Sequence, residues 1–318
     1  MKKHYSHFHD RTGEEIKNNQ GLKMKIIVYN GSDDILVKFE DGYKVKTQYG
    51  LFKRGNINNP NFRGANFKDR TGETNINFQN LNMEIIEYIN NSNIKIKFED
   101  GYICKTNYNC FKNGKVKSRY SPSVYGIGIL GDEPTSDESG NLYNSYITWK
   151  NMICRCYSNY TVYKQNTYID KYVCDEWLNY SNFKKWYDEN YYQIDNDVMA
   201  LDKDIIVKNN KVYSPSTAIF TPSRINNLFP KSDKSRGKYP IGVNKTRNNK
   251  YIAECSMLNN NGKRIRHKIG RFDTPEEAFQ AYKQFKEKYI KQVADEYKDK
   301  IPKKLYDAMY RYEVEITD

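Results

Sequence analysis

The sequence predicts a multidomain α+β protein: two tandem small β domains, a central mixed domain, and a C-terminal three-stranded antiparallel sheet backed by one helix. Three observations carry this prediction. The first 118 residues contain a duplication, residues 119–142 are rich in turn-forming residues, and the stretch 237–300 contains three short extended runs followed by a helical pattern. A length of 318 residues also favours two or three domains over one.

Composition indicates a polyanion as the partner. The formal net charge is +13 and the sequence pI is about 9.2, although a solvated basic surface is the simpler alternative. No apolar run approaches the length that crosses a membrane, and Met1–Lys3 lead into polar residues rather than a signal-peptide core. We therefore expect no membrane partner, a cytoplasmic protein of a bacterial host cell or nucleoid, and thiols rather than disulfides for the six cysteines.

The duplication defines two β repeats, residues 1–59 and 60–118. Matching segments recur without a gap at an offset of roughly sixty residues. They are Asp10–Glu14 with Asp69–Glu73, Met24–Ile27 with Met83–Ile86, and Phe39–Gly42 with Phe98–Gly101. In the first copy, strands are expected over 24–29, 35–39 and 43–47, with a hairpin turn at Asp41-Gly42. Each copy is predicted to be a small β-barrel or β-meander, whose role could be nucleic-acid contact, protein docking or scaffolding.

The N-terminal histidines do not indicate a metal site. His4, His7 and His9 lie close together in the first repeat, but the second repeat has Asn66 and Lys68 at the positions of His7 and His9. The fold of the repeat therefore does not need imidazole there, and we expect no metal at this end of the chain.

Residues 119–142 are predicted to be a linker. Proline, glycine, serine and acidic residues dominate this stretch. Gly126 and Gly128 might suggest a phosphate-binding loop, but the strand, helix and lysine that such a loop requires are absent from the surrounding sequence.

A different domain is expected over residues 143–230. Apolar residues recur at helical spacing over 146–157, and a second helix is predicted over 181–191. Cys154, Cys156 and Cys174 do not have the spacing of a zinc cluster and lack a fourth ligand nearby, so we interpret them as buried structural cysteines.

The C-terminal stretch 237–300 is predicted to bind nucleic acid. Extended runs over 241–245, 250–257 and 264–272 precede a helix whose start is marked by Thr274-Pro275 and a glutamate three residues after the threonine. In the third run Arg264, Arg266 and Lys268 alternate with Ile265, His267 and Ile269. Strand alternation therefore predicts one cationic face and one face covered by the helix. Lys245, Arg247 and Lys250 flank the first turn and are expected to reach the same surface or the adjoining phosphates.

This stretch also resembles the DNA-binding domain of the plant ethylene-response-factor family, the APETALA or AP-two type. The matching segments are Ile241–Val243, Lys250–Ala253, Ile269–Phe272, Thr274–Ala278 and Ala281-Tyr282. The resemblance implies a three-stranded sheet lying in the DNA major groove and backed by one helix. Lys268 stands where that family commonly has tryptophan, so the resemblance implies no base preference.

The segment Met199–Ile206 with its continuation to Asn227 resembles the ββα-metal core of HNH endonucleases. The resemblance places Asp202, Lys203 and Asn226 at catalytic positions and Asp202, Asp204 and Asn227 at metal positions, with Mg²⁺ or Mn²⁺ as the ion. The family's general-base histidine is replaced by Lys203, which is protonated at its ordinary pKa. The simpler alternative is that Asp202 and Asp204 flank a turn and that Asn226 caps a helix.

Two functions therefore stay open. The first is a sequence-specific double-stranded DNA-binding protein, such as a phage-type regulator of transcription, that reads the major groove with its C-terminal sheet. The second is a metal-dependent endonuclease of the homing type, found in phage-associated proteins, targeted by the same sheet. Residues 301–318 are expected to be a C-terminal tail, and the N-terminal repeats could bind a protein partner or, with only their charge in favour, RNA.

Overall fold

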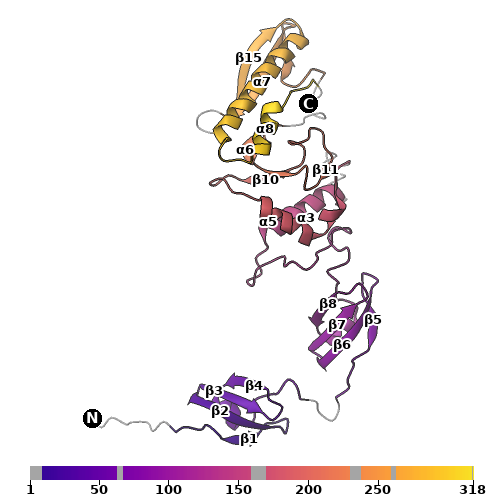
Figure 1. Cartoon of the computed structure of the whole chain (residues 1–318), viewed down its shortest axis with the longest axis vertical. Helices are drawn as coiled ribbons and strands as arrows, with labels where there is room; N and C mark the ends of the chain where they lie inside the picture. Colours follow the sequence, from indigo (N-terminus) through magenta and orange to yellow (C-terminus); the bar gives the residue numbers. More distant parts are fainter. Residues whose placement is uncertain (1–8, 63–66, 159–169, 230–237, 259–262, 317) are drawn as a thin grey trace, which may run out of the picture. The chain divides into compact units, whose positions relative to one another are not determined.

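The protein is a mixed α+β chain with several small antiparallel sheets, and it divides into two compact units, Met1–Ser121 and Pro122–Asp318 (Figure 1). The structure is a computed structural model that describes residues 9–62, 67–158, 170–229, 238–258, 263–316 and 318. Each unit is described by itself below.

Unit 1 contains two copies of one four-stranded antiparallel meander. The first copy consists of β1 (Glu15–Lys17), β2 (Lys23–Gly31), β3 (Asp34–Phe39), β4 (Lys44–Thr47) and the one-turn helix α1 (Tyr49–Lys53). The second consists of β5 (Thr74–Ile76), β6 (Asn82–Asn90), β7 (Asn93–Phe98), β8 (Ile103–Thr106) and α2 (Tyr108–Lys112). Strand order follows the sequence in both copies. Of the two predicted forms, the meander is the one observed.

The two copies bury equivalent apolar residues and turn at equivalent glycines. Met24, Ile26 and Phe39 are buried in the first copy at positions equivalent to Met83, Ile85 and Phe98 in the second. The turn glycines of the Asp-Gly pairs have φ of 88° at Gly42 and 89° at Gly101, a conformation that glycine adopts without strain.

An arginine packs over a tyrosine ring at equivalent places in both repeats. The guanidinium carbon lies 4.3 Å from the ring centroid for Arg11 over Tyr49 and 4.1 Å for Arg70 over Tyr108. In each pair the arginine also donates a hydrogen bond to the tyrosine hydroxyl at 2.7 Å. This long-range clamp ties the start of each repeat to its terminal helix.

Unit 2 begins with a segment that we expected to be a linker but that packs against the central helices. Val124, Ile127 and Leu130 contact the buried cluster built around Trp149 and Trp177. The amide of Ile129 donates to the carbonyl of Leu178 at 2.9 Å. From Pro122 onward the prediction of a free linker is therefore wrong, because apolar residues among the turn formers have a core to join.

The central part of unit 2 holds the two predicted helices and several short strands. The helices are α3 (Asn144–Tyr157) and α5 (Tyr180–Asn190), each within two residues of the predicted start, with the 3₁₀ turn η1 (Asp175–Leu178) between them. The strands are β9 (Tyr172–Val173), β10 (Met199–Asp202), β11 (Val212–Tyr213) and β12 (Ile219–Pro222), and the one-turn helix α6 (Ser223–Asn226) follows β12 directly. β10 pairs antiparallel with β12, and β11 pairs parallel with β9.

The C-terminal part is a three-stranded antiparallel sheet with a long helix across one face. The sheet has the order β13 (Val243–Lys245), β14 (Tyr251–Leu258), β15 (Arg264–Phe272), and α7 (Pro275–Tyr297) follows. The Thr274 side chain accepts from the Glu277 amide at 3.2 Å while the Glu277 carboxylate accepts from the Thr274 amide at 3.1 Å, the capping box that the sequence predicts. Residues 259–262, between β14 and β15, lie outside the described residues.

The helix α7 also belongs to a second core, which the sequence did not reveal. Its first half covers the sheet through Ala278, Phe279 and Tyr282. Its second half joins a buried cluster with β12, α6 and the turn after β10; the members from α7 are Tyr289, Ile290, Val293, Ala294 and Tyr297. The predicted domains 143–230 and 237–300 therefore share a core.

Residues 301–318 are not a tail. They include α8 (Lys303–Arg311), which lies beside α7 in Figure 1 and buries Leu305, Ala308 and Met309 in the same shared core. Val314 is buried in the sheet core. The end of the chain therefore stabilises both halves of unit 2.

These contacts predict where unit 2 can be cut. We expect a fragment 122–318 to unfold cooperatively. A fragment 143–318 should be less stable by about 2–5 kcal/mol, because it loses the burial of three apolar side chains and uncovers Trp149. Thermal and urea denaturation followed by circular dichroism measures the difference. Equal stability of the two fragments would show that residues 122–142 contribute nothing to the core.

Candidate nucleic-acid interface

The pairing register of the C-terminal sheet separates its cations from the helix. Residues directly opposite each other on paired strands point to the same side of a sheet. Cys255 is buried opposite His267, and the His267 ring stacks on Phe285 of α7 with centroids 4.7 Å apart. These residues therefore mark the helix side, and the side chains that alternate with them point away from α7.

Three predicted cations lie on the side away from the helix. Arg264 is opposite Leu258, Arg266 opposite Ser256, and Lys268 opposite Glu254. All three cationic side chains are exposed. The structure brings this part of the predicted site together as strand alternation requires.

A β-bulge adds a fourth cation that simple alternation misses. The register shifts between Ala253 and Glu254, so that Ile269 is the extra residue on β15. Beyond the bulge, Gly270 is opposite Ala253 and Arg271 is opposite Ile252, which transfers Arg271 to the outer side. The basic face, as we use the term below, consists of Arg264, Arg266, Lys268 and Arg271.

The basic face has little compensating charge. Among the described residues, no carboxylate forms an ion pair with any of its four cations. Glu254 is the one acidic residue that β13, β14 and β15 place on this side, and it accepts a weak hydrogen bond from the Asn244 amide at 3.5 Å. Uncompensated cations on one surface attract a polyanion, because their potentials add.

The other three predicted DNA-binding residues do not join the basic face. Lys245 is opposite Tyr251, which places it on the helix side at the end of β13. Arg247 is exposed in the turn between β13 and β14, and the Lys250 ammonium forms an ion pair with Asp273. These three residues lie around one end of the sheet. At that place they could contact DNA phosphates, but they could not contact bases that face the outer side of the sheet.

The predicted catalytic aspartate ends a strand and holds a turn. Asp202 Oδ1 accepts hydrogen bonds from the amides of Asp204 and Ile205, both at 2.8 Å. Burial, and secondarily the nearby Asp204 carboxylate, raises the pKa of Asp202 to about 6. The turn-forming role that we weighed as the simpler alternative is therefore present in the structure.

Lys203 is buried and its charge is already paired. The side chain is 8% exposed, and its Nζ lies 3.1 Å from Asp204 Oδ2 and 5.6 Å from the centre of the Tyr213 ring. An ammonium held by a carboxylate is a donor, so this geometry gives Lys203 no capacity to accept a proton.

The predicted helix ligands begin at the other end of the β10–β12 ladder. Asp202 is opposite Ile219, whereas α6 starts after Pro222, which is opposite Met199. That separation along the strands is roughly 10 Å. Asn226 is the last residue of α6 and Asn227 its C-cap, so neither caps the start of a helix.

The described residues offer few ligands for a metal ion near Asp202. They contain no group of three or more His, Cys, Asp or Glu side chains that could hold an ion. In the part of the chain that is described, no hydrogen bond joins Asp202 to Asn226 or Asn227. Asp202 and Asp204 supply two carboxylates of the hard type that Mg²⁺ prefers, but Lys203 neutralises one of them.

Cysteine and histidine form no metal-binding cluster among the described residues. All six cysteines are free, and Cys156 is buried, which raises the pKa of its thiol to about 11. His4 and His7 lie outside the described residues.

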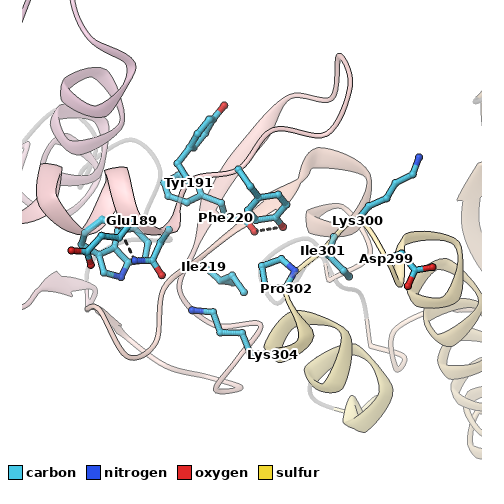
Figure 2. Close-up of a pocket in the computed structure, with 12 residues that line it drawn as sticks. Glu189, Tyr191, Ile219, Phe220, Asp299, Lys300, Ile301, Pro302 and Lys304 are labelled. Carbon is cyan, nitrogen blue, oxygen red and sulfur yellow. Dashed lines mark hydrogen bonds between the residues drawn. The ribbon is translucent and has the colours of Figure 1, made fainter.

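A pocket at the junction of the two halves of unit 2 has mixed charge. It lies between the end of α5, β12 and the turn from α7 to α8 (Figure 2), and its volume is about 410 Å³. Glu189 and Asp299 line it together with Lys300 and Lys304, and its aromatic residues Phe220 and Trp186 are buried. Both signs of charge and covered ring faces make it a poor match for a nucleic-acid strand, unlike the basic face.

No helix in the described residues is both long and apolar enough to cross a membrane.

Comparison with protein-family models, with curated proteins and with solved structures found no match.

The raised pKa of Asp202 predicts that ionisation of this carboxyl lowers the free energy of unfolding, so that the stability of the fold depends on pH. A carboxyl whose pKa is higher in the folded chain stabilises the fold below its ordinary value near 3.8, and this contribution is lost as pH rises through about 6. Asp202→Asn keeps the oxygen that accepts both amides but removes the charge. We expect this variant to be more stable than the parent at pH 7.5, by on the order of 1–3 kcal/mol.

Urea denaturation at pH 7.5 and pH 4 measures this difference, which should shrink at the lower pH. Asp195→Asn, at a side chain 82% exposed, is the control for loss of one surface charge. A destabilised Asp202→Asn at pH 7.5 would contradict the account of this carboxylate.

Proposed function

We propose that the protein binds double-stranded DNA sequence-specifically and that the basic face lies in the major groove. The observation that carries the proposal is the set of four exposed cations on the uncovered side of a three-stranded sheet, with no carboxylate partner among the described residues. Lysine and arginine contacts to phosphate supply most non-specific affinity for DNA.

The dimensions of the sheet suit the major groove. Neighbouring strands lie about 4.8 Å apart, so the outer strands of a three-stranded sheet are separated by roughly 10 Å, against a groove about 12 Å wide. The AP-two resemblance implies the same placement, with the helix on the side away from DNA. Because α7 covers only one face, DNA could meet the other without any rearrangement of the core.

The outer side chains also include groups that can distinguish bases. Arginine bonds both acceptors of guanine, a carboxylate such as Glu254 can accept from the cytosine amino group, and an apolar side chain such as Ile252 can contact the thymine methyl group. A purely electrostatic surface would not need this mixture. We therefore favour sequence-specific binding by a regulator of phage type that acts in the cytoplasm or nucleoid of a bacterial host.

The endonuclease stays a second candidate because of one arrangement. β10, β12 and α6 provide two paired strands with a helix directly after the second, the order that the HNH resemblance implies. In an active enzyme Asp202, Asp204 and Asn227 would hold Mg²⁺ or Mn²⁺, which would stabilise charge on the scissile phosphate. The pairing of Lys203 with Asp204 makes binding without cleavage the better-supported function.

The N-terminal repeats are proposed to dock a protein partner. Their duplicated cores and Arg–Tyr clamps provide two rigid platforms that differ mainly at exposed positions. Ile76 and Phe78 in the second copy are 55% and 75% exposed, where the first copy has Lys17 and Asn19.

Base discrimination should depend on Arg266. We expect Arg266→Ala to lose about 1–3 kcal/mol of discrimination between the specific site and a variant at the base pair it contacts, because a bidentate arginine–guanine pair is worth that much. A selected duplex is tested in competition against its single-base variants. Equal loss for all sequences would reassign Arg266 to a phosphate.

The basic face is tested by the triple variant Arg264/Arg266/Lys268→Ala, which removes three of its four cations and leaves Arg271. It should abolish specific binding while circular dichroism shows a folded protein. A matched control removes the same charge from exposed lysines on and just after α7, Lys288, Lys291 and Lys298. If a folded triple variant binds as well as this control, the basic face is merely solvated and the proposal fails.

Cleavage is tested with plasmid DNA in Mg²⁺ or Mn²⁺. If the central region is a nuclease, Asp202→Asn should abolish nicking while DNA affinity stays within about twofold of the parent, because the basic face is unchanged. Nicking that survives this substitution would rule out Asp202 as a ligand. No nicking by the parent on any substrate would leave DNA binding as the activity.

A further inference from the structure

A second pocket lies where the sheet meets α6. It has a volume of about 240 Å³ and is lined by residues of α6 and its end, of β14, of β15 and of α7: Arg224, Asn227, Leu228, Ser256, Met257, Leu258, Arg264 and Tyr289. This is below the 300–1,000 Å³ typical of sites for whole small molecules. A single phosphate group is nearer to its scale than a cofactor.

The polar groups of this pocket are suited to an anion. Two guanidinium groups, Arg224 and Arg264, line it together with the Asn227 amide and the Ser256 hydroxyl, and no carboxylate is among its described lining residues. Asn227 and Ser256 are exposed, so their donors can reach a ligand.

Arg224 is held in place and still has an unused donor. Its Nη2 lies 2.5 Å from Glu296 Oε2, and its guanidinium carbon is 5.7 Å from the centre of the Tyr297 ring. Its buried Nε has no hydrogen-bond partner in the described structure. The ion pair with Glu296 and the Tyr297 ring therefore fix the position of the guanidinium beside the pocket.

The pocket continues the basic face. Arg264 belongs to both, and Ser256 lies on the same outer side of the sheet, opposite Arg266. Arg224 and Asn227 extend the donors onto α6 and its end. From Arg264 to Arg271, β15 spans roughly 23 Å, or about seven base pairs along a DNA axis. A DNA strand that continues past Arg264, beyond the end of the sheet, therefore meets α6 next.

We propose that this pocket binds one backbone phosphate of the same DNA duplex, just beyond the base pairs that the sheet covers. The inference rests on the proposed function and adds to it a contact from the central half of unit 2. It assigns Arg224 and Asn227 to positioning the DNA on the protein. Neither residue would read a base, because a phosphate contact is indifferent to sequence.

The test uses Asn227→Asp in the full chain, which places a carboxylate in the pocket with almost no change of shape. Its control is Gln280→Glu, which adds the same charge at an exposed position of α7. We expect Asn227→Asp to weaken binding by roughly five- to twentyfold for all sequences alike, and to lower the salt dependence of affinity by about one phosphate equivalent. Asn227→Ala is the second variant, at the same exposed position, if Asn227→Asp does not fold.

A set of duplexes with single neutral methylphosphonate links locates the contact. One link outside the sheet's footprint should weaken the parent but not Asn227→Asp. If the parent binds DNA, the basic-face triple variant does not, and Asn227→Asp matches Gln280→Glu, then the phosphate site is wrong while the proposed function stands. If the parent binds no duplex, both fail together.

Discussion

The packing of α7 is the interaction on which unit 2 depends. One helix supplies apolar side chains to two cores: its first half covers the sheet, and its second half fills the space between β12, α6 and α8. Phe285 lies at the transition and contacts both clusters. Removing α7 would therefore uncover the sheet and the central ladder at once.

This arrangement sets what the rest of the sheet can do. Because the helix packs across one side, the other side is left to solvent or to a ligand, and the four cations of the basic face lie there. The backbone at Gly242, just before β13, passes very close to α7. A Cβ at Gly242 would lie 2.2 Å from a ring carbon of Tyr282, and the φ of 76° also favours glycine, so no other residue fits between β13 and α7.

Local patterns predicted the local structure well. Contacts between neighbouring residues determine the Asp-Gly turns and the Thr274–Glu277 cap, and the repeat is visible without a gap in the sequence. Strand alternation alone placed Arg264, Arg266 and Lys268 on one side of the sheet. Arg271 was missed because a bulge reverses the alternation, and no residue in β15 marks the extra position. The shared core was missed because it joins the second half of α7 to β12 and α6, which lie more than sixty residues earlier in the chain. The role of α8 was missed because residues 301–318 were taken for a tail, although α8 packs against the neighbouring helix α7. Residues 122–130 were taken for a linker because their few apolar residues carry no periodicity.

The central site shows the limit of motif reasoning. The order Asp202, Lys203, Asp204 was interpreted as a metal and catalytic sequence, but in the structure the same residues close a turn through two amide hydrogen bonds and one buried ion pair. Both interpretations need a carboxylate at Asp202, so the sequence alone could not separate them. The positions of Asn226 and Asn227 depend on the ladder register, which the sequence does not state.

In the proposed complex, DNA lies against the outer side of the C-terminal sheet. The most direct measurement places a photo-crosslinking amino acid at Ser256, opposite Arg266 on the outer side, or at Gln280, exposed on α7. The account predicts crosslinks to a bound duplex from position 256 and none from position 280. Crosslinks from position 280 alone would place DNA on the helix side and contradict it.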